Sequence, residues 1–160
     1  MKRMAAILAL ALGVAFNANA GMDEGQQYYI SGEYDKALAE FKPLAEQGDA
    51  KAQYYMGFLY HHGYGMKRDE VEAAKWFRMG AEQGEWQSQY YLGVIYEKGV
   101  GMKHDLAVAH MWLSLAATNP GATFRDSLHT KEAVSKLEQK MKPEQIAQAR
   151  DMAKGWKPQN

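Results

Sequence analysis

The sequence has no cysteine among its 160 residues. Disulfide bonds are therefore excluded, although an exported protein could have used them. A lipid anchor on an N-terminal cysteine is excluded as well. Stability must come from core packing alone, and 10 tyrosines, 4 tryptophans and 5 phenylalanines supply much of the material for it.

The chain also lacks an excess of charge of either sign. It has 19 basic and 19 acidic residues, and its formal net charge is 0. Nucleic-acid binding domains usually show a basic patch or stripe, and docking to anionic lipid usually needs a cluster of basic residues. Neither pattern is present, so we expect no nucleic-acid partner.

Long apolar runs are missing except near the N-terminus. After a short basic stretch, Met4 to Phe16 form an uncharged apolar run of 13 residues. A membrane-spanning helix needs about 20. Ala18 and Ala20 then provide the small residues that a signal peptidase reads, so residues 1–20 are predicted to be a cleaved secretory signal peptide. We expect an exported protein, periplasmic or secreted, with no membrane span after cleavage.

The alternating pattern of β-strands is absent, and apolar residues recur every three or four positions, which predicts helices. Gly25 is expected to interrupt the first helix, and Pro43 is expected to bend the second. The predicted helices cover residues 22–30, 34–47, 49–60, 69–82, 85–98, 105–118, 124–141 and 143–154.

The chain repeats itself in two adjoining copies of 36 residues, 45–80 and 81–116. Sixteen of the 36 positions are identical. A period of this length is typical of helical repeat arrays, which usually present a surface for a partner. Each copy predicts two helices joined by a glycine-containing loop. Residues 119–160 depart from the period and are predicted to cap the open end of the array.

A glycine stands inside the first helix of each copy, at Gly57 and Gly93. Glycine inside a helix costs roughly 1 kcal/mol relative to alanine. We expect the missing side chain to let the paired helix approach closely, with Trp76 or Phe77 filling the groove. At the start of the second helix, Asp69 is predicted to cap the backbone, paired with Glu72.

The repeated positions resemble the Sel-1-like repeat (SLR) of the tetratricopeptide-like superfamily. In the first copy the signature comprises Ala52, Gly57, Tyr60, Gly63, Gly65, Asp69, Ala73 and Trp76. In the second copy it comprises Gly93, Tyr96, Gly99, Gly101, Asp105, Ala109 and Trp112. Residues 21–44 are more similar to an ordinary tetratricopeptide repeat.

The resemblance implies an all-α fold, a right-handed α/α solenoid of stacked helix-turn-helix repeats with a C-terminal helical cap. It also implies a non-enzymatic adaptor or scaffold of the bacterial envelope that binds a protein or peptide partner; we expect a monomer. The first helix of each such repeat lines the concave side. The candidate partner-binding residues there are Tyr29, Tyr54, Phe58, Tyr90 and Val94.

Catalytic and metal-binding patterns are scarce. Loop residues His61, His62 and His104 are interpreted as solvated rather than as zinc ligands, because an adjacent pair cannot easily bind one ion. No serine has a lysine three residues later, and no G-x-S-x-G occurs. No cofactor is predicted. Some cysteine-rich relatives have been linked with β-lactam chemistry, so a β-lactam or cell-wall hydrolase is the alternative.

Overall fold

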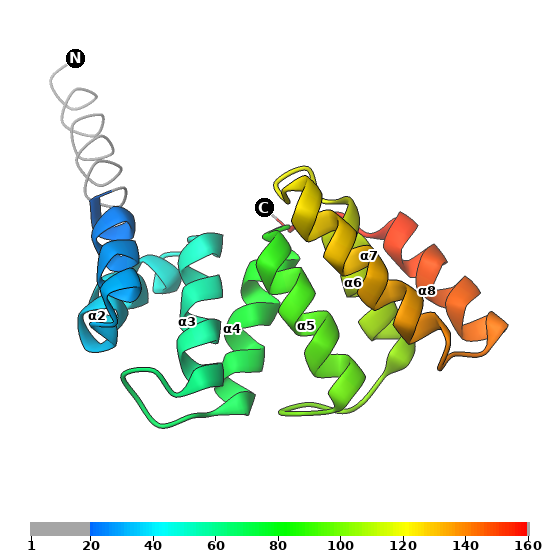
Figure 1. Cartoon of the computed structure of the whole chain (residues 1–160), viewed down its shortest axis with the longest axis horizontal. Coiled ribbons are helices and arrows are strands. Elements are labelled where there is room, and N and C mark those ends of the chain that lie inside the picture. The colour runs from blue at the N-terminus through cyan, green and yellow to red at the C-terminus, as the bar shows by residue number, and fades with distance from the viewer. Residues whose placement is uncertain (1–19, 160) are drawn as a thin grey trace, which may run out of the picture.

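The computed structural model describes residues 20–159, and this part of the chain is helical without strands. An N-terminal helix covers 20–31 and is followed by seven more (Figure 1). These are α2 (Tyr34–Glu46), α3 (Ala50–His62), α4 (Glu70–Glu82), α5 (Trp86–Lys98), α6 (Leu106–Thr118), α7 (Phe124–Glu138) and α8 (Pro143–Gly155). The predicted signal peptide lies outside the described residues except for Ala20, so it stays a prediction.

Successive helices lie side by side and form an all-α solenoid, as the sequence predicts (Figure 1). Helix α2 packs on α3, α3 on α4, α4 on α5, and so on to α7. Within residues 20–159, no helix is both long and apolar enough to cross a membrane. We call the 20–31 helix, α3, α5 and α7 the A helices, and α2, α4, α6 and α8 the B helices.

The ends of the helices follow from acidic residues and glycines placed 36 residues apart. The side chain of Asp69 accepts hydrogen bonds of 3.0 Å from the backbone amides of Val71 and Glu72, and Asp105 caps α6 in the same way. The predicted reciprocal bond from Glu72 is not made, because that carboxylate pairs with Lys75. At the other end, Gly63 ends α3 in the left-handed conformation, with φ of 69°.

A glycine in each A helix admits a core side chain from the paired B helix. A Cβ built on Gly57 would lie 2.7 Å from the ring of Phe77, and one on Gly93 would lie 2.7 Å from Leu113. Gly25 does the same for Phe41, at 2.5 Å. The expectation that Gly25 interrupts the first helix is wrong, since the helix continues through it to residue 31.

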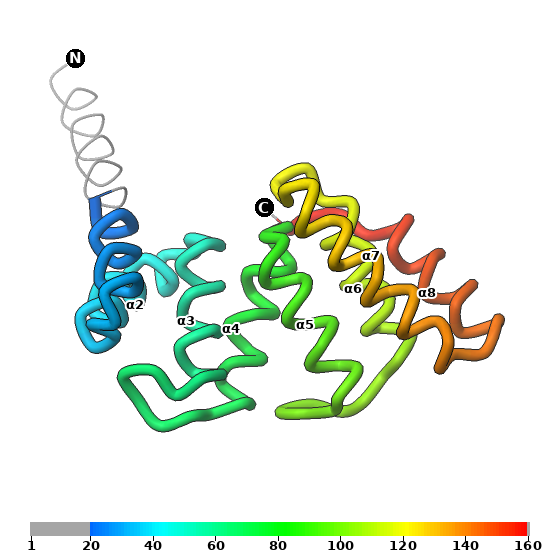
Figure 2. The backbone as a smooth tube through the Cα atoms, viewed as in Figure 1, coloured from blue at the N-terminus to red at the C-terminus, as the bar shows by residue number. Residues whose placement is uncertain are grey.

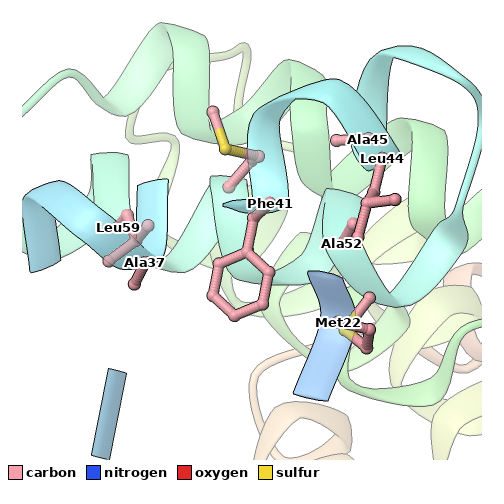
Figure 3. Packing of buried hydrophobic residues seen from close by; sticks show 8 residues of the cluster. Met22, Ala37, Phe41, Leu44, Ala45, Ala52 and Leu59 are labelled. Carbon is pink, nitrogen blue, oxygen red and sulfur yellow. The ribbon is translucent and has the colours of Figure 1, made fainter. Parts of the chain in front are cut away.

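Phe77, and not Trp76, fills the groove at Gly57. Phe77 is fully buried, whereas Trp76 is partly buried and packs against the cluster formed by the first helices. The equivalent side chain in the first pair is Phe41, which Figure 3 shows in the middle of its apolar neighbours. The glycine and the apolar residue together set how closely each helix pair packs.

The loops after α3 and α5 lie at the same edge of the molecule (Figure 2). In each loop a second glycine, Gly65 or Gly101, has a positive φ of 71° or 75° and contacts the start of the preceding B helix. A Cβ on Gly101 would collide with the backbone carbonyl of Glu70. The signature glycines are therefore required both by backbone conformation and by close approach.

Buried amides join one repeat to the next. The Gln53 amide donates to the carbonyl of Ala45 over 3.1 Å, and its oxygen accepts from Gln83 over 2.8 Å. Thirty-six residues on, the oxygen of Gln89 accepts from Asn119 over 3.2 Å. Because Gln53 and Gln89 are almost fully buried, these bonds satisfy polar groups that would otherwise be costly.

The C-terminal cap has a different arrangement from the repeats. Helices α7 and α8 both pack against α6, and α7 contains no glycine. Trp156 lies edge-on to Trp112 with ring centroids 5.9 Å apart. The tail then turns back toward the end of α4, where the Gln159 amide donates to the carbonyl of Glu82 over 2.8 Å.

Candidate functional site

Aromatic side chains of three A helices form an unbroken row of ring contacts on one side of the solenoid. The row, which we call the aromatic face, comprises Tyr29 of the 20–31 helix, Tyr54, Tyr55 and Phe58 of α3, and Tyr90 and Tyr91 of α5. Ring centroids are 5.7 Å apart for Tyr29 and Phe58, 6.1 Å for Tyr54 and Tyr91, and 5.6 Å for Tyr90 and Tyr91. All six side chains are partly exposed.

Two members of the row connect it to the core. Tyr55 stacks on Phe41 at 4.3 Å and Tyr91 stacks on Phe77 at 4.8 Å, in both cases with rings within 5° of parallel. Phe41 and Phe77 are the residues that pack against Gly25 and Gly57. The positions of the surface rings are therefore set by the same packing that closes each helix pair.

Part of this face was predicted from the sequence. The structure brings the predicted residues Tyr29, Tyr54, Phe58 and Tyr90 into the row, together with Tyr55 and Tyr91, which were not predicted. The tyrosine pair repeated at 54–55 and 90–91 was the available signal. Val94 packs, as Tyr90 does, against the cluster that contains Leu113 and Leu137.

The aromatic face carries tyrosine hydroxyls and no charged residue among its six members. Burial, followed by the nearby Tyr34, raises the pKa of Tyr29 to about 12. Burial is also the main cause of a strongly raised pKa at Tyr54, with Tyr91 the next contributor. These phenols stay protonated at neutral pH, so they can donate and accept hydrogen bonds without carrying charge.

A pocket opens where the aromatic face meets the cap, between α3, α5 and α7. Its volume is about 330 Å³. It is lined by Tyr54, Trp86, Gln87, Tyr90, Tyr91, Asp126, His129 and Thr130. His129 Nε2 lies 3.4 Å from the hydroxyl oxygen of Tyr90, which links α7 to α5 across the pocket.

The two histidines at the end of α3 contact residues close to them in the structure. His61 Nδ1 lies 2.7 Å from a carboxylate oxygen of Glu70. The His62 ring lies 4.2 Å from that of Phe58, and burial lowers the pKa of His62. In residues 20–159 no three histidine or acidic side chains lie close enough together to hold a metal ion.

The two structural repeats match the sequence model of a known repeat family. The Sel1 repeat model matches residues 50–85 and 86–120, so its frame begins with α3 and α5, whereas our sequence comparison counts from 45 and 81. No curated protein sequence matches the chain.

Solved structures similar to this chain include two that are named for the same repeat or fold. One is a protective antigen present in uropathogenic Escherichia coli strains and displaying an SLR fold, with 33% identity and a TM-score of 0.77 over 85% of this chain. The other is a Sel1 repeat protein from Oxalobacter formigenes, with 31% identity and a TM-score of 0.60 over 66% of this chain. This chain spans 29% and 45% of their respective lengths. The two matched repeats and these two likenesses identify the chain as a Sel1-like repeat protein.

Proposed function

We propose that this chain is a non-enzymatic adaptor of the bacterial envelope that binds an extended peptide or protein segment on its aromatic face. Sel1 repeat proteins are generally protein-interaction modules. The observation that carries the proposal is the row of six partly exposed rings across three A helices. Solenoids commonly present binding surfaces of this extended kind.

The physical basis of binding is a rigid, amphipathic surface. Tyrosine offers a large contact area and loses little conformational freedom on binding, because it has only two side-chain torsions. Here the stacking of Tyr55 on Phe41 and of Tyr91 on Phe77 restricts the rings before any partner arrives. A preorganised surface binds more tightly because less ordering is needed at the moment of association.

Selection from a display library of random peptides tests the proposal with the folded protein as bait. The wild type is expected to enrich peptides whose affinity falls at least about tenfold on Tyr54→Ala or Phe58→Ala, as for central aromatic residues of an interface. Phe124→Ala is the matched control, since Phe124 is 86% exposed and lies outside the face. Binding that is equally strong in all three variants, each folded by circular dichroism, would contradict the proposal.

The hydrolase alternative is examined with the same preparation and a chromogenic β-lactam. An adaptor is expected to give no turnover above the buffer rate. Turnover that copurifies with the protein, and that disappears when the protein is removed, would show that the chain is an enzyme instead.

Export is proposed from the signal-like residues 1–20. Cell fractionation followed by N-terminal sequencing is expected to find a mature chain that begins at Gly21 outside the cytoplasm. A full-length chain confined to the cytoplasm would contradict the proposed location in the envelope. It would not test the binding face, which the peptide selection tests independently.

A further inference from the structure

We infer that the pocket between α3, α5 and α7 binds a cationic side chain, lysine or arginine, of the polypeptide that lies on the aromatic face. The inference rests on the proposed function and adds the chemistry of one residue of the partner. It is carried by the kinds of side chain that line the pocket and by their charge.

Four aromatic side chains line the pocket: Tyr54 from α3, and Trp86, Tyr90 and Tyr91 from α5. The Tyr90 and Tyr91 rings meet almost perpendicularly, at 87°, and the ring centroids of Tyr54 and Tyr91 are 6.1 Å apart. The negative faces of aromatic rings attract cations, by roughly 0.5–2 kcal/mol for each well-placed ring. Rings that surround one space on several sides are the usual arrangement for holding an organic cation.

A carboxylate completes this arrangement. Asp126 of α7 lines the pocket, and no lysine or arginine does. Its Oδ2 atom accepts from the Thr123 hydroxyl over 2.6 Å and from the Thr123 amide over 3.3 Å, within the cap of α7. Among the described residues, Oδ1 of Asp126 has no hydrogen-bond partner, so it is available to a ligand.

The charge balance favours a cation over the other occupants. An anion would face the Asp126 carboxylate with no basic partner other than the His129 imidazole. A purely apolar side chain would cover Oδ1 of Asp126 without giving that oxygen a hydrogen bond, which is costly. A lysine or arginine places its aliphatic part against the rings and its charged end at Asp126.

The position of the pocket also fits a bound polypeptide. Tyr54 and Tyr91 belong both to the pocket lining and to the aromatic face. A chain lying on Tyr29 and Phe58 would therefore reach the pocket at the α7 end of the row. The pocket volume of about 330 Å³ accommodates one side chain and its neighbouring backbone.

The test uses two small probes and three variants of the full chain. N-acetylarginine amide is the cationic probe, and N-acetylcitrulline amide is its uncharged counterpart of nearly the same shape. Titration is followed by the NMR signals of the Trp86 indole and of Tyr54, Tyr90 and Tyr91. The arginine probe is expected to shift these signals and to bind at least about fivefold more tightly than the citrulline probe, as expected for a desolvated cation–π site with a carboxylate.

The variants distinguish the contribution of the Asp126 charge to binding from that of the aromatic rings. Asp126→Asn keeps an oxygen for the cap of α7 and removes the charge, and it is expected to weaken the arginine probe about fivefold without affecting the citrulline probe. Trp86→Leu, which leaves Asp126 in place, is expected to weaken the arginine probe severalfold. Glu132→Gln is the matched control, because it removes a carboxylate of α7 that does not line the pocket, and it is expected to change nothing.

Equal affinity for the two probes, or an arginine affinity unchanged by both Asp126→Asn and Trp86→Leu, would overturn the inference. The peptides selected on the aromatic face separate this failure from that of the proposed function. Selected peptides that depend on Tyr54 and Phe58 but show no enrichment of basic residues would overturn the cation pocket and leave the adaptor standing. Binding of the arginine probe in the pocket without any selected peptide would support the cation pocket and contradict the adaptor function.

Discussion

The repeats and the C-terminal cap join their helices in different ways. In the 20–31/α2, α3/α4 and α5/α6 pairs, a glycine of the A helix receives Phe41, Phe77 or Leu113 from the B helix. Helix α7 has no glycine, and α7 and α8 both pack on α6 instead. Close pairing at a glycine is therefore a feature of the repeats, and the cap helices are joined without it.

The largest expected effect comes from the side chain that occupies the glycine groove. Phe77→Ala is expected to lower the free energy of unfolding by about 3–5 kcal/mol, because a fully buried aromatic leaves a cavity. Trp76→Ala, next to it but only partly buried, should cost clearly less. Chemical denaturation of both variants measures the difference. A larger loss for Trp76→Ala would contradict the assignment of Phe77 to the groove.

The second-largest effect on stability is expected from replacing the glycine that admits Phe77. Gly57→Leu is expected to destabilise the fold by about 1–3 kcal/mol or more, because the added side chain would overpack the ring of Phe77. Gly155→Ala is the matched control, since a Cβ there meets nothing within 4 Å. Thermal melts should show a lowered midpoint for the first variant alone. Similar midpoints for the two would mean that close approach is not what the repeat glycine provides.

The smallest expected effect lies in the cap and depends on pH. A hydrogen bond from His110, together with Arg150, holds the pKa of Glu138 below its usual range; the His110 Nε2 to Glu138 distance is 2.8 Å. This contribution to stability is present at neutral pH, above the unfolded-state pKa. It is lost as the pH falls through the lowered folded-state pKa.

Glu138→Gln should therefore weaken the cap slightly at neutral pH and remove part of its sensitivity to acid. Hydrogen exchange of α7 amides across a series of acidic pH values measures this, with Glu132→Gln as the control. An unchanged pH profile in Glu138→Gln would show that this carboxylate does not hold the cap.

Local features of the fold were predictable from the sequence. Helix ends are set by nearby residues such as Asp69, Asp105, Gly63 and Gly99, which act on their own backbone. The predicted bounds therefore agree with the structure to within about two residues for α3 to α6. The predicted bound of 141 for α7 overshot its observed end at Glu138, where no glycine marks the stop.

Features that depend on how helices face each other were not predictable. Trp76 and Phe77 are neighbours, and only the rotation of α4 against α3 decides which one meets Gly57. The same rotation directs Tyr55 and Tyr91 onto Phe41 and Phe77, so two members of the aromatic face were missed. The pocket was not predictable either, because it forms where α7 approaches α5, and no repeat pattern indicates that approach.

In the function that we propose, the aromatic face, and not the B-helix side, receives a polypeptide. The most direct measurement is NMR shift mapping of the full chain with a peptide selected from the display library. We predict that the perturbed residues lie on the 20–31 helix, α3 and α5, centred on Tyr54 and Phe58. Perturbations confined to α4, α6 and α8 would contradict the proposed binding face.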